Sequence, residues 1–237
     1  MTPWIFKVLK IIFVLLLIAL IALVGVYAIY NQPLPIGKPG LEADTLAAKM
    51  LRAVNYKAYK DTRYLEWTFR KGAHKYTWDK HKGKAKVSWE NYTVDLKLGS
   101  LTKSIAFEDG KQLKGNEKDE LVNKPIAFFN NDSFWLVAPY KVFDKGVKRG
   151  LVVLDDGTEA LLVTFQSGGS TPGDSYLWKL QPNGFPQNFQ MWVKIIPIGG
   201  LKASWDDWQV VESGAFLPKS HTIGPITLDM GEVRAYN

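Results

Sequence analysis

The sequence predicts an α+β fold in which an N-terminal transmembrane helix is followed by a curved, open antiparallel sheet. Three observations predict it: an uncharged apolar stretch from Ile11 to Tyr30, a helical pattern over residues 41–54, and short alternating segments separated by Gly-containing turns. The spacing predicts about 10–11 strands covered by one or two helices. A sheet of that size must curl or split, and we expect an open half-barrel.

The N-terminal apolar stretch is long enough to cross a membrane. Its 20 residues extend over about 30 Å as a helix. Lys7 and Lys10 precede it, and residues 31–37 carry no positive charge, so the N-terminus is expected in the cytoplasm. Cleavage as a signal peptide, with Val26–Ala28 as the cleavage site, is the alternative. The stretch is longer than a usual signal core of about 7–15 residues, which favours an uncleaved anchor.

Three domain segments follow from this pattern. Residues 1–30 are predicted to be a cytoplasmic stub and a single-pass anchor in the cytoplasmic (inner) membrane. Residues 31–40 contain three prolines and are predicted to be a short, stiff linker. Residues 41–237 are predicted to be one β-rich domain in the periplasm or another extracytoplasmic space.

The first half of the domain reads as a helix and then a meander of strands. Leu41–Val54 is predicted to be an amphipathic helix. Alternation then marks short strands, beginning with Leu65, Trp67 and Phe69, and the alternation slips at Glu90-Asn91, which indicates a bulge or a tight turn. Gly-containing pairs at 71–72, 82–83 and 109–110 mark the turns between antiparallel strands.

The second half repeats this order. Residues 116–130 are predicted to be a helical segment interrupted at Pro125, and residues 134–140 a short helix or strand. A second meander follows, with strands around 151–154, 161–165, 176–180 and 189–195. The last strands are expected within 205–211, 215–222 and 226–236.

Composition excludes several classes of site. The chain has no cysteine, which excludes disulfides, thiolate metal sites, a cysteine nucleophile and a lipid-modified N-terminal cysteine. The net charge is +7, and residues 55–115 hold 14 Lys and Arg against seven acids. A basic face can attract anionic membranes or nucleic acid, but we favour a solvated strand face. The predicted location also argues against a nucleic-acid partner.

No motif predicts catalysis or a cofactor. The chain lacks a phosphate-binding loop, a dinucleotide fingerprint and a nucleophile elbow. His74, His81 and His221 are not spaced as metal ligands, and Asp206-Asp207 reads as a turn or bulge. We therefore predict a non-enzymatic protein with no catalytic residue, no metal and no cofactor.

The domain resembles the LolA and LolB carrier proteins and their envelope relatives over roughly residues 41–236. The matching pieces are Ala43–Leu51 leading into the Trp67 and Phe69 strand, Phe134–Lys141, Thr171–Leu177 and Gly214–Pro218. The resemblance implies an open half-barrel around an apolar cavity, with a helical lid. A carrier that shuttles across the periplasm must diffuse, whereas this chain is predicted to be tethered, so lipoprotein transport is not implied.

We predict a membrane-anchored binding protein that holds an apolar ligand in the concavity of the half-barrel. The ligand would be a lipid, an acyl chain or a lipoprotein moiety. The chain has eight tryptophans beyond the anchor, and their large apolar area either fills a core or lines such a cleft. The predicted lining residues are Leu65, Trp67, Phe69, Trp78 and Trp89 on the sheet, with Trp135 and Tyr140 in the lid.

Two alternatives stay open. The first is an interaction module with a packed core, whose surface binds another envelope protein. The second and weaker one is a hydrolase, which would need Asp, His and Ser residues gathered from distant strands.

Overall fold

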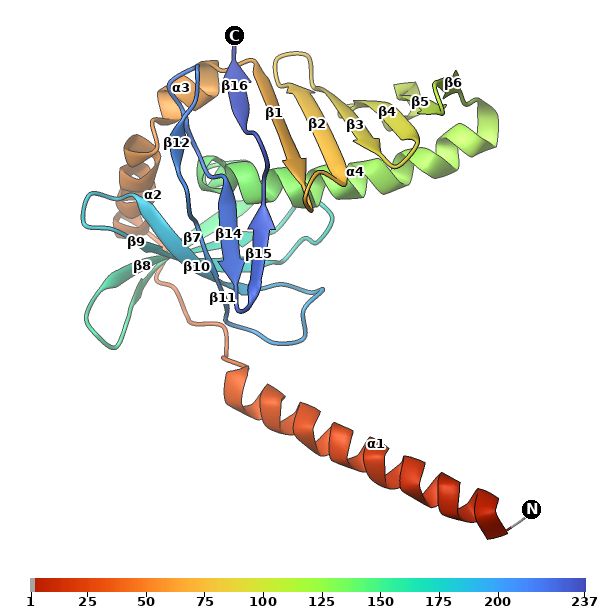
Figure 1. Cartoon of the computed structure of the whole chain (residues 1–237). Helices are drawn as coiled ribbons and strands as arrows, with labels where there is room; N and C mark the ends of the chain where they lie inside the picture. The colour runs from red at the N-terminus through yellow and green to blue at the C-terminus, as the bar shows by residue number, and fades with distance from the viewer. Residues whose placement is uncertain (1–2) are drawn as a thin grey trace.

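The computed structural model describes residues 3–237, in which an exposed N-terminal helix leads into an α+β domain (Figure 1). Helix α1 covers Pro3–Tyr30. Its segment Trp4–Tyr30 has a peak mean hydropathy of 3.1, and none of that apolar window is buried within the part of the chain that the structure describes. Such a helix has the length and composition of a membrane anchor or a signal sequence.

Two large antiparallel sheets form the domain, and neither closes into a barrel. The first has seven strands in the order β16 (Arg234–Tyr236), β1 (Tyr64–Phe69), β2 (His74–Asp79), β3 (Lys84–Trp89), β4 (Tyr92–Lys97), β5 (Ile105–Glu108) and β6 (Lys111–Gln112). The second has five, in the order β11 (Leu201–Ser204), β10 (Pro186–Trp192), β9 (Ser175–Leu180), β8 (Glu159–Phe165) and β7 (Val147–Val153). The predicted α+β fold with open antiparallel sheets and covering helices is confirmed.

Two small hairpins complete the strands, and they explain why the sequence underestimates the strand number. They are β12 (Gln209–Val210) with β13 (Phe216–Leu217), and β14 (Ser220–Ile223) with β15 (Ile226–Asp229). Strands of two to four residues are too short to show a period of two. The slip predicted at Glu90-Asn91 is a two-residue hairpin turn, since Trp89 pairs with Tyr92 and Glu90 has a φ of 47°.

Helix α4 (Gly115–Val137) crosses the inner face of the seven-stranded sheet, as the green helix in Figure 1 shows. The sequence predicts an interruption at Pro125, but the helix continues through it to Val137. Proline removes one helical hydrogen bond. Pro125 is itself buried, and Val122 and Phe129 pack into the core on either side of it, so tertiary packing outweighs the lost bond.

Shorter helices lie at the edges of the domain. Helix α2 (Leu41–Ala53) confirms the predicted amphipathic helix and packs against β7 and β8. It is followed by α3 (Tyr56–Asp61). Two 3₁₀ turns, η1 (Leu101–Lys103) and η2 (Ala138–Lys141), join β4 to β5 and extend α4.

Alternation along β1 to β3 buries one face of the seven-stranded sheet beneath α4. Trp67 stacks on Tyr76 with ring centroids 4.5 Å apart, and Phe129 of α4 meets Trp78 edge-on at 5.3 Å. The other face is basic and solvated, and its Lys86 lies opposite Asp95 on the neighbouring strand. The lysine-rich stretch is therefore the outer face of a sheet, as expected from its alternation with aromatic residues.

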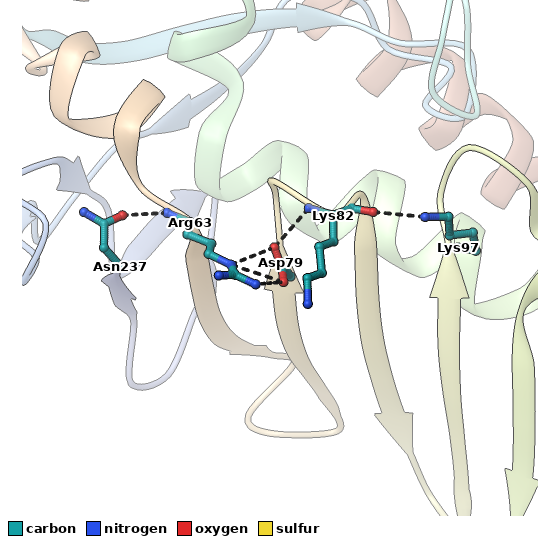
Figure 2. A network of polar contacts seen from close by, with 5 residues as sticks. All are labelled: Arg63, Asp79, Lys82, Lys97 and Asn237. Carbon is teal, nitrogen blue, oxygen red and sulfur yellow. Dashed lines mark hydrogen bonds and ion pairs between the residues drawn. The ribbon is translucent and has the colours of Figure 1, made fainter.

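A network of polar contacts connects residues at one end of this sheet (Figure 2). The Arg63 guanidinium donates to both carboxylate oxygens of Asp79, with Nη2 and Oδ2 3.0 Å apart, and the Lys82 backbone N–H donates to Oδ1 at 3.0 Å. The hydrogen bond from Arg63 lowers the pKa of Asp79. The Arg63 backbone N–H also donates to Asn237, so the network ties β1, the β2–β3 turn and the C-terminus together.

Residues 31–40 lie against the five-stranded sheet. Lys38 and Leu151 of β7 exchange two backbone hydrogen bonds of 2.8 Å, which form an antiparallel bridge. Gly37 and Gly150 approach so closely that a Cβ on Gly150 would come within 2.8 Å of the Gly37 backbone. At the other end, Gln32 is hydrogen-bonded to Gly199 between β10 and β11. The proline-containing segment thus contacts the five-stranded sheet near both of its ends.

Candidate ligand cavity

A cavity of about 540 Å³ lies where α4 passes from the seven-stranded sheet to the five-stranded sheet. The N-terminal part of α4 covers the first sheet, and its last turns reach the second, where Phe134 contacts Tyr176 and Trp135 contacts Phe189. The space borders α4 and both open sheets, and side chains fill it only in part. The volume falls within the range of about 300–1,000 Å³ typical of small-molecule sites.

The interior of the cavity is largely apolar and draws on both sheets and on α4. Its walls are formed by Trp78, Leu98, Phe129, Phe134, Trp135, Val137, Val147, Phe165, Tyr176, Met191, Val193, Ile195 and Ile196. The aromatic rings interlock: Phe134 meets Phe165 edge-on at 5.4 Å, and Phe165 meets Tyr176 at 5.8 Å. Burial raises the pKa of the Tyr176 phenol, which therefore stays neutral in the wall at ordinary pH.

Most polar lining residues of the cavity belong to two connections, which we call its polar rim. They come from the η2–β7 connection, which supplies Lys141, Asp144 and Lys145, and from the β8–β9 loop, residues 166–174. Lys141 and Asp144 form an ion pair of 2.7 Å, whereas Lys145 has no ion-pair partner within residues 3–237. The cavity therefore combines an apolar interior with a polar rim that carries a free cationic group.

The rim loop is held in place by specific hydrogen bonds. Asn130 of α4 donates from Nδ2 to Ser170 Oγ at 3.3 Å. The Asp174 carboxylate accepts from the Lys194 backbone N–H at 3.0 Å and from the Thr171 hydroxyl. These contacts connect α4, the β8–β9 loop and the loop after β10, the three elements that surround the cavity.

One buried polar cluster lies beside the cavity, between α4 and β2. His74 Nδ1 lies 2.7 Å from Asp132 Oδ2, and the Tyr76 hydroxyl donates to the same oxygen at 2.5 Å. Asn131, which lines the cavity, donates to Asp132 Oδ1 at 2.8 Å. Burial and the Asp132 carboxylate raise the pKa of Tyr76, so the phenol keeps its proton as a donor. The buried Asp132 carboxylate thus contacts three side chains, which indicates a structural role.

The structure brings only some of the sequence-predicted ligand residues to the cavity. Trp78 and Trp135 line it. The other five are buried in the core around it: Leu65, Trp67, Phe69, Trp89 and Tyr140. Tyr140 is held by hydrogen bonds from its hydroxyl to the Val54 and Phe216 carbonyls. The predicted strand phase therefore faces the helix, and most of that face is covered by packed α4 side chains.

Several cavity residues are not among those predicted from the sequence. Phe165, Tyr176, Met191 and Val193 all lie at inward positions of the second meander. Alternation in those strands already marks them as inward-facing, but the sequence alone does not show that the second sheet, rather than the first, borders the space. His74 and Asp132 are 58 residues apart, and no local pattern pairs them.

Buried indole N–H groups without acceptors are a further feature of the interior. Trp78 Nε1 is buried and has no hydrogen-bond partner among the residues that the structure describes, although the ring lines the cavity. An unpaired buried donor is costly, so an oxygen atom of a bound molecule would stabilise this position. Within residues 3–237, no group of three His, Asp or Glu residues lies close enough to hold a metal ion.

Comparisons with known proteins give a structural likeness. No family model matches the chain, and no curated protein matches its sequence. A crystal structure of a DUF1329 family protein from Desulfovibrio piger superposes with a TM-score of 0.40 at 8% identity, covering 83% of this chain and 93% of that chain. The structural similarity is thus to a DUF1329 family protein, and the comparisons give the LolA and LolB resemblance no separate support.

Proposed function

We propose that this chain is a membrane-anchored, non-enzymatic binding protein that holds an amphipathic lipid-like molecule in the cavity between its two sheets. The observation that carries the proposal is an apolar cavity of about 540 Å³ bordered by a polar rim. Apolar walls favour a hydrocarbon chain, at roughly 25 cal/mol for each Å² removed from water. The rim favours a polar or anionic head group, because Lys145 offers an unpaired ammonium there.

Two further features support the proposal. Helix α1 has the length and hydropathy of a membrane span, which would keep the domain beside a source of lipid. The resemblance to LolA and LolB, drawn from the sequence, also implies an apolar cavity. The domain would then lie on the extracytoplasmic side, because Lys7 and Lys10 lie near the N-terminal end of the helix, before its uncharged stretch.

The proposal is tested by photocrosslinking the full chain in nanodiscs with a diazirine-bearing fatty acid. We expect crosslinked peptides that contain Phe134, Tyr176 or Met191, because these residues meet in the cavity. Ala127→Trp places an indole in the cavity wall and should lower the crosslinking yield severalfold. Ala73→Trp changes an exposed alanine in the β1–β2 turn and should leave the yield unchanged.

Crosslinks confined to α1 would overturn the proposal, because they would show contact with bulk lipid alone. Equal yields for Ala127→Trp and the parent chain would do the same. Near-UV circular dichroism of both variants establishes that the fold is retained.

A further inference from the structure

The loop between β10 and β11 is fixed to the end of α1. Asn31, the first residue after the helix, accepts from the Gly199 backbone N–H at 2.8 Å through Oδ1. The Gln32 N–H donates to the Gly199 carbonyl at 2.9 Å, and the Trp192 indole donates to the Gln32 carbonyl at 2.8 Å. A Cβ on Gly199 would lie 2.5 Å from the Trp192 ring, so this close contact requires glycine.

This loop is largely apolar and partly exposed. Its sequence from Val193 is Val-Lys-Ile-Ile-Pro-Ile-Gly-Gly, and the Ile195 side chain is 70% exposed. The turn of the β14–β15 hairpin, Ile223-Gly-Pro-Ile226, lies at the same end of the domain (Figure 1), and Ile226 is 57% exposed. Exposed branched side chains gathered at one end of a domain mark a surface that meets an apolar partner.

The position of α1 identifies that partner. If the stretch from Ile11 to Tyr30 spans a membrane, then Tyr27 and Tyr30 lie at its far interface, where aromatic side chains are favoured. Gly199 is hydrogen-bonded to the very next residue, Asn31. The loop therefore starts at the level of the lipid head groups, continuous with the span.

The same loop forms part of the cavity wall. Ile195 and Ile196 line the cavity together with Met191 and Val193 of the preceding segment. The cavity therefore extends to the surface that is held against the end of α1.

We propose that the loop Lys194–Ile198 and the turn Ile223–Ile226 insert into the interfacial layer of the membrane that α1 spans, and that the cavity opens to the bilayer at this loop. The occupant of this surface is the lipid bilayer itself. A lipid chain would enter the cavity from the bilayer past Ile195 and Ile196 without crossing water. The inference rests on the proposed membrane anchorage and adds the route by which the ligand arrives.

Because the chain contains no cysteine, single-cysteine labelling tests the inference directly. Full-length Ile195→Cys and Ile226→Cys are labelled with the environment-sensitive dye NBD and reconstituted into vesicles of phosphatidylethanolamine and phosphatidylglycerol. Nitroxide-labelled lipid should quench both by about twofold, since interfacial segments lie about 5–10 Å deep. Ile105→Cys on β5 is the matched control, because Ile105 is also exposed but lies on the sheet away from α1 (Figure 1), and it should not be quenched.

The outcomes separate this inference from the proposed function. Chains that do not float with the vesicles would overturn the anchorage and the inference together. Floating chains whose labels at 195 and 226 are quenched no more than at 105 would overturn the inference alone. Quenching at 195 and 226 without fatty-acid crosslinks in the cavity would support the docking surface and overturn the ligand cavity.

Discussion

Burial of the His221 side chain makes the stability of this fold depend on pH. Its ring is fully buried between Trp135 and Trp205, with centroids 5.1 and 4.5 Å away, and its Nδ1 donates to the Ser204 carbonyl at 3.0 Å. Burial lowers the pKa of His221 to about 4. The folded protein therefore keeps the neutral imidazole under conditions in which the unfolded chain binds a proton.

The free energy of unfolding should consequently fall as the pH falls from about 6.5 to about 4. The ordinary pKa is 6.5 and the folded value is about 4, so the contribution is complete above pH 6.5 and lost as pH approaches 4. The difference between these two pKa values corresponds to roughly 3 kcal/mol in the free energy of unfolding. Urea unfolding followed by tryptophan fluorescence measures it. His221→Gln should flatten this part of the pH profile, whereas His81→Gln, at an exposed site, should leave it unchanged.

Asp132 presents a different case, a buried carboxylate that contacts three side chains. Asp132→Ala leaves His74 and Tyr76 buried without their shared acceptor. We expect the free energy of unfolding to fall by about 3–5 kcal/mol. The exposed Asp119→Ala on the same helix should change it by less than about 0.5 kcal/mol. Equal effects of the two changes in urea melts would contradict a structural role for the cluster.

At the scale of elements, strand and helix periodicity predicts most of this molecule. The apolar stretch to Tyr30, the helix from Leu41 and the alternation at Leu65, Trp67 and Phe69 all mark real elements. The predicted interruption at Pro125 is wrong because the penalty for proline is local. The packing of Phe129 and its neighbours, which offsets that penalty, is tertiary and does not show in a local pattern. The docking of residues 31–40 cannot be predicted, because it depends on contacts with Leu151 and Gly199, more than 100 positions away.

The contact between Gly37 and Gly150 gives a direct test of that docking. Gly150→Ala would place a Cβ within 2.8 Å of the Gly37 backbone, and the linker must shift. We expect amide hydrogen exchange at Lys38 and Leu151 to rise by about tenfold or more, because overpacking costs about 1–3 kcal/mol. Gly99→Ala, where the new Cβ would meet open space, should leave exchange at both amides unaltered.

At the scale of the whole molecule, the cavity forms only when the two sheets and α4 pack together. It lies between two sheets and a helix that join only through tertiary contacts, so its lining comes from five separate parts of the chain between Trp78 and Ile196. Sequence reasoning predicts an apolar cavity and two of its lining residues, Trp78 and Trp135. It places Tyr140 in the lid and the other four predicted residues in the first meander, because periodicity shows which face of a strand points inward but not what covers that face.

The polar rim predicts that the cavity binds a ligand with an anionic head group more tightly than a neutral one. Lys145→Glu replaces the unpaired ammonium beside the cavity with a carboxylate. Binding of a fatty acid should weaken by about two- to fivefold, the scale of an exposed ion pair, while binding of the corresponding fatty alcohol should change little. Lys148→Glu on β7 makes the same charge change at an exposed site that does not line the cavity and should affect neither ligand. Fluorescence titration of the full chain in detergent measures both affinities.

The bridge between Lys38 and Leu151 also bears on self-association. If α1 anchors the chain as proposed, its copies meet in two dimensions, where an unpaired strand edge favours pairing between neighbours. Here the linker occupies part of the outer edge of β7, and the β14–β15 hairpin lies beside β11, with His221 and Thr222 bonded to Ser204. The other sheet ends in the two-residue β6, which carries Lys111, and in β16, whose Ala235 N–H is bonded to Glu212. Each sheet thus ends in an edge that is short, charged or already occupied, so copies of this chain can crowd together without joining their sheets.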